Sequence, residues 1–310
     1  MEFSQNVLYG ISNKKYLSEL LQIDKNKLKN VSEYFVTDPF IQKKKGKERE
    51  FYNPSPEHKN ALKKIVKFLS ALDIPDYITG GIRQRSYVSN VELHRSNKFG
   101  IIIDVADFFP STNADRVYKF FKYQMKQSYD IAKILKELTT VTKGDKSFLP
   151  QGYPTSPILS FLAYLDMYTQ LEKYAEYHGL CFTAYYDDLT FSSDKIIHKN
   201  HKKRIIKIIK SYSLDINKKK SKVTKLNNIK ITGCIIRNGE LKAPQKLQKE
   251  TYDLYKLLKS DKLKNYSKSD IEKLLRKFTG KISAIQMVEK KRNFPNYKKC
   301  ISEIKSRYKI

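Results

Sequence analysis

Three aspartates near the middle of this chain are the residues whose types and spacing best suit chemistry. Asp187 and Asp188 are adjacent and lie between two short stretches of β-forming residues, at 181–184 and 189–191. Two neighbouring carboxylates at a hairpin tip repel each other, and a bound cation removes that repulsion. Asp104 ends a separate apolar run. If the strands are neighbours, three hard oxygen donors converge, which is the kind of site that Mg²⁺ prefers.

The chemistry expected of such a site is phosphoryl transfer. Two Mg²⁺ ions held by carboxylates can activate an attacking hydroxyl and stabilise the leaving group of an in-line displacement. An Asp-Asp pair alone is equally typical of a solvent-exposed turn, because Asp is a turn-forming residue. The surrounding sequence has to decide between these two interpretations.

The elements that must position the aspartates can be predicted from hydrophobic patterning. Residues 99–105 form a continuous apolar run, which favours a buried strand, and residues 181–193 alternate as a hairpin does. An amphipathic helix is predicted over 56–72, and 243–310 are expected to be helical. Together these patterns predict an α+β fold.

The charge of the chain indicates a polyanionic partner. Its 310 residues include 61 Lys and Arg against 32 Asp and Glu, a formal charge of +29. Such an excess destabilises a compact chain by self-repulsion, and nucleic acid is the partner that would neutralise it. Residues 241–310 are especially basic, with 17 Lys and 3 Arg against 7 acidic residues. This excess indicates a C-terminal region that grips nucleic acid, although any single Lys is as well explained by a solvated helix face.

The sequence pattern argues against a membrane-spanning protein and against a protein built on disulfides or a cysteine metal cluster. No stretch approaches about 18 consecutive apolar residues, so no membrane partner is expected. Cys181, Cys234 and Cys300 are scattered and form neither a metal cluster nor a disulfide framework, which favours a cytoplasmic location.

Five segments resemble, in order and spacing, the motifs of reverse transcriptases, and more narrowly those of bacterial retron-type enzymes. They are 104–109 (DVADFF), 149–157 (LPQGYPTSP), 185–188 (YYDD), 214–221 (LDINKKKS) and 231–233 (ITG). Two positions depart from the retron pattern. Tyr186 stands where retron enzymes usually carry Ala, and Val91 replaces the Ala of the retron marker in 90–94 (NVELH).

The resemblance implies a set of catalytic residues. Asp104, Asp187 and Asp188 would hold two Mg²⁺ ions, helped by the backbone carbonyl of Val105. Lys220 would act as general acid to the leaving pyrophosphate, although Lys218 and Lys219 lie beside it.

The resemblance also implies a pocket for the nucleotide and template. Arg49 would contact the triphosphate, and Phe109 would be the steric gate that excludes a 2′-hydroxyl, with a core Phe as the alternative. Gln151, Gly152 and Tyr185 would line the same pocket.

Contacts to RNA or primer are expected from two further groups. The first comprises the retron-type segments, with Asn90, His94, Thr232 and Gly233; His94 is equally well explained as a core or capping residue. The second comprises Lys249 and Lys256 on the basic C-terminal helix.

The fold implied by the resemblance is the right-hand polymerase fold. We expect an N-terminal region and fingers in 1–100, a palm with an antiparallel sheet in 101–240, with fingers-side helices at about 112–150, and a helical, RNA-binding thumb in 241–310.

The function implied is RNA-directed DNA polymerisation from dNTPs on a structured non-coding RNA that serves as both template and primer. Retron enzymes leave a branched RNA–DNA product (msDNA), pair with an accessory effector protein and act in anti-phage defence. No RNase H-like segment is evident in the sequence, so a host RNase H is expected to remove the template. Two alternatives stay open. One is a bacterial reverse transcriptase of the group II intron, diversity-generating or abortive-infection type; the other is a non-catalytic RNA-binding scaffold.

Overall fold

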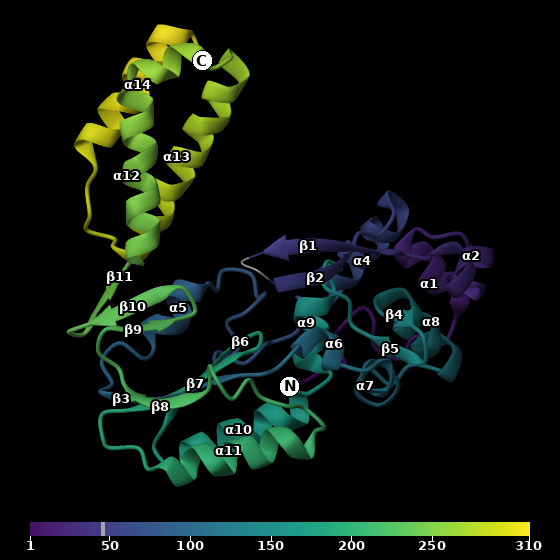
Figure 1. Cartoon of the computed structure of the whole chain (residues 1–310). Coiled ribbons are helices and arrows are strands. Elements are labelled where there is room, and N and C mark those ends of the chain that lie inside the picture. The colour runs from purple at the N-terminus through teal and green to yellow at the C-terminus, as the bar shows by residue number, and fades with distance from the viewer. Residues whose placement is uncertain (45–46) are drawn as a thin grey trace. The chain divides into compact units, whose positions relative to one another are not determined.

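The computed structural model describes residues 1–44 and 47–310 (Figure 1). The chain divides into two compact units, each considered by itself. The first comprises residues 1–86 and 99–224, and the second comprises residues 87–98 and 225–310. The predicted partition into fingers, palm and thumb is a functional one and stays a prediction.

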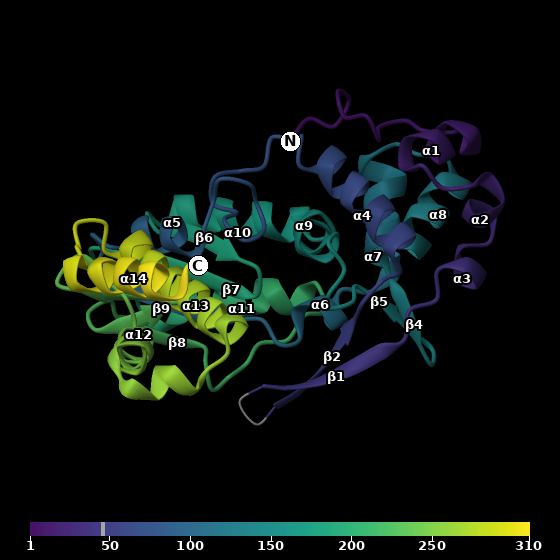
Figure 2. The same cartoon turned by 90° about the horizontal axis from the view of Figure 1, so that it is seen from above.

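The first unit is built on a four-stranded sheet with the strand order β6-β7-β3-β8. These strands are β3 (Phe99–Asp104), β6 (Cys181–Tyr185), β7 (Asp188–Ser193) and β8 (Lys222–Lys225). β7 pairs antiparallel with both β3 and β6. Helices α10 (Leu165–Tyr177) and α11 (Lys199–Ser211) run side by side along one face of this sheet (Figures 1 and 2).

The remaining elements of the first unit surround this sheet or precede it in the chain. Two hairpins are formed by β1 (Pro39–Lys44) with β2 (Lys47–Tyr52) and by β4 (Val141–Lys143) with β5 (Lys146–Phe148). The helices are α1 (Lys14–Leu21), α2 (Lys25–Lys29), α3 (Val31–Tyr34), α4 (Pro56–Leu69), α6 (Phe108–Ser111), α7 (Ala114–Lys119), the π-helix η1 (Phe120–Gln124), α8 (Tyr129–Thr139) and α9 (Ser156–Leu162).

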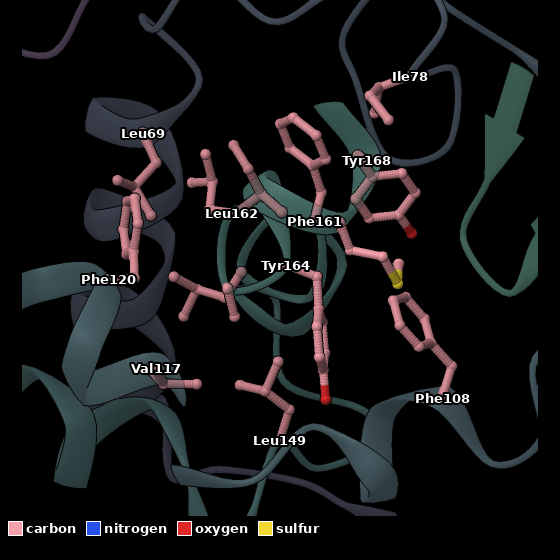
Figure 3. Packing of buried hydrophobic residues seen from close by; sticks show 14 of the residues in the cluster. Leu69, Ile78, Phe108, Val117, Phe120, Leu149, Phe161, Leu162, Tyr164 and Tyr168 are labelled. Atoms are coloured by element: carbon pink, nitrogen blue, oxygen red, sulfur yellow. The ribbon is translucent and has the colours of Figure 1, made fainter. Parts of the chain in front are cut away.

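One hydrophobic core runs through the first unit from the N-terminal helices to the sheet. Its aromatic residues pack closely: the ring centroids of Phe108 and Tyr164 are 5.9 Å apart, and those of Phe182 and Phe191 are 4.5 Å apart. Figure 3 shows Tyr164 among apolar side chains from several elements. The core therefore joins the strands that end in the aspartates to the helices behind them.

The second unit combines a small sheet with a helical part. Strands β9 (Ile229–Ile231), β10 (Cys234–Arg237) and β11 (Glu240–Lys242) form an antiparallel sheet, and α5 (Tyr87–Glu92) packs against β10. Helices α12 (Gln245–Lys259), α13 (Lys268–Val288) and α14 (Pro295–Tyr308), with the 3₁₀ turn η2 (Asp261–Asn265), form a bundle (Figure 1).

The α+β class and the main elements predicted from the sequence are confirmed. The strand expected at 99–105 is β3, the hairpin expected at 181–193 is β6–β7, and the helix expected at 56–72 is α4. Within the described residues, no helix is long and apolar enough to cross a membrane.

We expect Phe191→Ala to be strongly destabilising. Phe191 is fully buried at the centre of the sheet and stacks on Phe182, so the truncation leaves a cavity and should cost about 3 to 5 kcal/mol of unfolding free energy. Urea unfolding followed by circular dichroism measures this. Tyr177→Ala, at a ring that is 86% exposed, is the control and should change stability by less than about 0.5 kcal/mol. Equal effects of the two substitutions would contradict the packing described.

Candidate active site

The floor of the candidate site is formed where β3 and β7 pair. Asp104 lies directly opposite Asp188 in the antiparallel register, and the backbone N–H of Val105 donates to the carbonyl of Asp187 over 2.8 Å. Opposed residues of an antiparallel pair project from the same face of the sheet. Strand pairing therefore brings Asp104 and Asp188 together, and Asp187 in the turn lies near enough for the charge of Asp104 to raise its pKa.

Burial and mutual repulsion both raise the pKa values of Asp187 and Asp188. Burial, followed by the charges of Asp187 and Asp104, raises the pKa of Asp188 from its ordinary 3.8 to about 7, and Lys220 opposes this shift. Burial also raises the pKa of Asp187, against the lowering effects of Lys220 and Arg49. A site that so disfavours negative charge will gain free energy from any cation that it binds.

Lys220 is the cation nearest to these acids. Its ammonium group forms an ion pair with Asp104 Oδ2, and this hydrogen bond raises the pKa of Lys220. The segment that carries Lys220 is fixed to the end of β3, because Asn217 N–H donates to the Asp104 carbonyl over 2.8 Å and Asp104 N–H donates to Ser221 Oγ over 3.1 Å. These backbone contacts at the end of β3 thus position Lys220 beside Asp104.

The three carboxylates have the right chemistry for Mg²⁺ but do not form a complete cage. Across residues 1–44 and 47–310, no three Asp, Glu, His or Cys side chains are gathered so as to enclose a metal ion by themselves. Mg²⁺ usually keeps several water ligands and is held by one or two carboxylates plus substrate phosphates. Asp104, Asp187 and Asp188 fit that mode of binding.

A pocket of about 570 Å³ opens above this floor and is lined by most of the residues predicted for the site. Its walls include Arg49, Asp104, Val105, Phe109, Gln151, Gly152, Asp187 and Lys220. Asp188 and Tyr185 are half-buried in the adjoining hairpin rather than in the pocket wall. The volume falls within the range of about 300–1,000 Å³ typical of ligand pockets.

The 149–157 loop is attached to β2 by its backbone. Tyr52 N–H donates to the Gln151 carbonyl over 2.8 Å, and Gly152 has a φ of 116°. A Cβ at Gly152 would lie 2.3 Å from the Tyr52 carbonyl oxygen, so only glycine fits. The backbone that approaches this glycine belongs to β2, and the contact sets Gln151 beside the strand that carries Arg49.

Phe109 lies in the short helix α6, whose first residue follows a left-handed Asp107 with a φ of 44°. Thr112 Oγ1 donates to the Phe108 carbonyl over 2.8 Å and closes the turn. Phe109 is half-buried and lines the pocket beside Val105 and Pro110. It is therefore a wall of the pocket that also packs against the hydrophobic core.

A loop that sequence reasoning missed supports the aspartate hairpin. Ala184 in β6 donates to the Tyr77 carbonyl over 2.8 Å, and Thr79 N–H donates back to the Ala184 carbonyl over 2.9 Å. The side chain of Arg85 donates to the carbonyls of Ile74 and Ile78 and holds this loop closed. The only sequence signal was the pair Gly80-Gly81, which permits close approach of two backbones.

The retron-type segments 90–94 and 231–233 contact each other within the second unit. Asn90 Nδ2 donates to Thr232 Oγ1 over 3.2 Å, and Thr232 Oγ1 donates to the Tyr87 carbonyl over 3.2 Å. Asn90 and His94 are 0% exposed, and burial lowers the pKa of His94 to about 3. Neither side chain has exposed surface, which favours the alternative of a core residue for His94; their expected RNA contacts stay a prediction.

The other expected RNA contacts lie at or near the surface of the second unit. Thr232 and Gly233 are half-buried in the turn before β10, with φ values of 42° and 110°. Lys249 and Lys256 are exposed on α12, and the Lys256 ammonium lies 4.8 Å from the centroid of the Tyr252 ring. Of these four residues, only Lys249 and Lys256 offer RNA an exposed, charged side chain.

We expect the stability difference between the wild type and Asp188→Asn to depend on pH. The folded chain holds a proton on Asp188 more tightly than the unfolded chain does, so this contribution is full below about pH 4 and is lost as the pH rises towards 7. The wild type should lose up to about 4 kcal/mol relative to the variant across that range. Urea unfolding at several pH values in metal-free buffer measures it. A constant difference, or one that grows in favour of the wild type, would refute the raised pKa.

Comparisons with known proteins agree with this geometry. The chain is 29% identical over 236 residues to the Retron Se72 reverse transcriptase of Salmonella heidelberg (strain 579083-10), which covers 72% of this chain and 61% of that protein. It is 31% identical over 223 residues to the Retron Ec86 reverse transcriptase of Escherichia coli, covering 68% of this chain and 66% of that one. The match to the Retron Ec48 reverse transcriptase of Escherichia coli is 25% over 313 residues, covering 93% and 75%.

The chain thus spans slightly less than two thirds of the first two of these relatives. Residues 41–236 match the family model described as reverse transcriptase (RNA-dependent DNA polymerase). This segment makes up more than half of the chain and contains the aspartates, the pocket and the supporting loop, and the chain therefore belongs to the reverse transcriptase family.

Proposed function

We propose that this chain is an RNA-directed DNA polymerase of the retron type, which joins deoxynucleotides to a primer by nucleotidyl transfer. The observation that carries the proposal is the pairing of Asp104 with Asp188 beside Asp187, next to a pocket lined by Arg49 and Lys220. Carboxylates beside cations in one pocket suit a substrate that brings phosphates and metal ions together.

Reverse transcriptases use divalent metal ions in general. In this proposal Asp104, Asp187 and Asp188 would hold two Mg²⁺ ions, together with the backbone carbonyl of Val105. Bound there, the ions supply Lewis-acid activation of the primer hydroxyl and neutralise charge on the leaving group. The primer hydroxyl would lose its proton to solvent as its oxygen bonds to the α-phosphorus. The bond from that phosphorus to the oxygen bridging it to the β-phosphorus would break, and pyrophosphate would leave.

The pocket walls have complementary roles towards the nucleotide. Arg49 pairs with the triphosphate, as the fork of a guanidinium suits phosphate oxygens. Lys220 lies on the aspartate side of the pocket and gives its proton to the departing pyrophosphate. Phe109 lies against the sugar and excludes a 2′-hydroxyl, while Gln151 and Gly152 shape the pocket for the base pair.

RNA binding is proposed for the second unit, whose helices would act as the thumb. Lys249, Tyr252, Lys256 and Lys259 recur along α12 at helical spacing, and all four are exposed. An A-form duplex has a wide, shallow minor groove, which a helix can follow through contacts with sugars and phosphates. The first unit would then supply fingers and palm.

The wider retron role is part of the same proposal and is supported by the similarity to retron reverse transcriptases alone. The RNA would be a structured non-coding transcript that is both template and primer, and the product a branched RNA–DNA molecule (msDNA). We further propose that the chain acts with an accessory effector protein in anti-phage defence. A host RNase H would remove the template.

The proposal predicts that Asp187→Asn with Asp188→Asn abolishes primer extension on an RNA template with Mg²⁺ and dNTPs. Removing metal ligands forfeits several kcal/mol of transition-state stabilisation, so the rate should fall more than about a hundredfold. Asp145→Asn with Asp194→Asn removes the same charge at two exposed positions outside the pocket and should leave extension unchanged. Equal extension by the wild type and the active-site variant would reject catalysis here, and RNA binding without extension would favour the scaffold.

A second expectation concerns the salt dependence of RNA binding. Lys249→Gln with Lys256→Gln should weaken binding to an RNA duplex and reduce the slope of log affinity against log salt by about 1 to 2, because about one counterion is released per phosphate contact. Fluorescence anisotropy at several salt concentrations measures the slope. Lys298→Gln with Lys299→Gln, on α14, is the matched control. Equal slope changes in both variants would show that binding is not localised on α12.

A further inference from the structure

The side chain of Tyr186 fills a slot beside the nucleotide pocket. Tyr186 is the first residue of the two-residue turn between β6 and β7 and has a φ of 55°, which is unusual for a residue with a side chain. Its ring is half-buried and lines the pocket together with Asp187. The turn therefore directs an aromatic ring towards the pocket at the same point where it presents a catalytic carboxylate.

One side of this slot is a fixed wall. A Cβ at Gly81 would lie 3.0 Å from Tyr186 Cε1, 3.3 Å from Tyr186 Oη and 2.9 Å from Pro157 Cβ, so the ring lies directly against the glycine. Gly80 is equally close to the turn, because its Cβ would lie 2.6 Å from the backbone nitrogen of Tyr186. This wall is hydrogen-bonded to β6 through Thr79, so the Tyr186 ring cannot retreat towards it.

The other side of the slot is Phe109. The ring centroids of Tyr186 and Phe109 are 6.2 Å apart at an angle of 68°, the edge-to-face arrangement that aromatic pairs prefer. Phe109 is packed on a second side by Phe108, with 6.2 Å between ring centroids. Tyr186 is thus held between the glycine wall and the face of the pocket that Phe109 forms.

We propose that Tyr186 is a positioning residue that fixes the Phe109 ring and thereby increases discrimination against ribonucleotides. The proposal rests on the proposed function, since it assigns a role in selecting the nucleotide. A ring that excludes a 2′-hydroxyl does so only as far as it cannot move aside. Tyr186, backed by Gly81, blocks one direction in which Phe109 can yield.

The test compares Tyr186→Ala with Tyr186→Phe in single-nucleotide primer extension. The measured quantity is kcat/KM for dTTP divided by kcat/KM for UTP, with each value determined separately. We expect the ratio to fall about fivefold in Tyr186→Ala, which corresponds to about 1 kcal/mol, the size of an edge-to-face ring pair. Tyr186→Phe keeps the ring and should keep the wild-type ratio.

A double-mutant cycle separates this role from a general one in shaping the turn. In a Phe109→Ala background, Tyr186→Ala should change the ratio by less than about twofold, because no ring is left to support. Loss of dTTP extension with an unchanged ratio, or the same fivefold effect in both backgrounds, would overturn the proposal. Should Tyr186→Ala not fold, Tyr186→Asn replaces it, because Asn tolerates the left-handed φ and is too short to support the Phe109 ring. An unchanged ratio in that variant would overturn the proposal as well.

The failure of this inference is distinguishable from the failure of the function. A wild type that extends the primer with dTTP, with an equal ratio in Tyr186→Ala, keeps the polymerase and rejects the support of Phe109. A wild type that extends with neither nucleotide rejects both.

Discussion

The repulsion among three carboxylates is the interaction on which the rest of the site depends. The pairing of β3 with β7 places Asp104 opposite Asp188, and the turn adds Asp187. In water these charges would separate, and here the strand register prevents it. Neighbouring contacts hold this arrangement: Lys220 pairs with Asp104, and the Thr79 loop is hydrogen-bonded to Ala184 in β6. A cation is the partner that such an arrangement favours most.

The acids and their strands could be predicted because the signals are local. Residues 99–105 and 181–193 show strand patterning, and each stretch brings an acid to the same edge of the sheet. The supports could not be predicted, because they are contacts between segments far apart in sequence. Gly80-Gly81 permits close approach of another backbone but does not identify Ala184 as the partner of this loop, and nothing around Gly152 indicates that its neighbour is Tyr52.

The second unit shows why a shared sequence pattern does not by itself assign a role. The pattern in 90–94 led us to expect RNA contacts, yet Asn90 and His94 lie wholly inside, where Asn90 bonds to Thr232. A buried polar side chain is costly unless it is hydrogen-bonded, so such residues are tightly constrained by packing as well as by function. A residue that packs and a residue that binds RNA look the same in sequence, and the burial of Asn90 and His94 favours packing.

The excess of positive charge and the acidic cluster act at different ranges. A chain of +29 attracts nucleic acid at a distance of about a Debye length, whereas the carboxylates at the pocket floor repel a phosphate only on close approach. In the proposed function the bound cations reverse the sign of that local field. Metal and template–primer should therefore bind with positive coupling, and reciprocity requires that nucleic acid raise the affinity for metal by the same factor as metal raises the affinity for nucleic acid. The three carboxylates do not enclose a metal ion by themselves, and in the proposed function substrate phosphates would supply the missing ligands. The metal site would then be complete only when metal and nucleic acid are both bound.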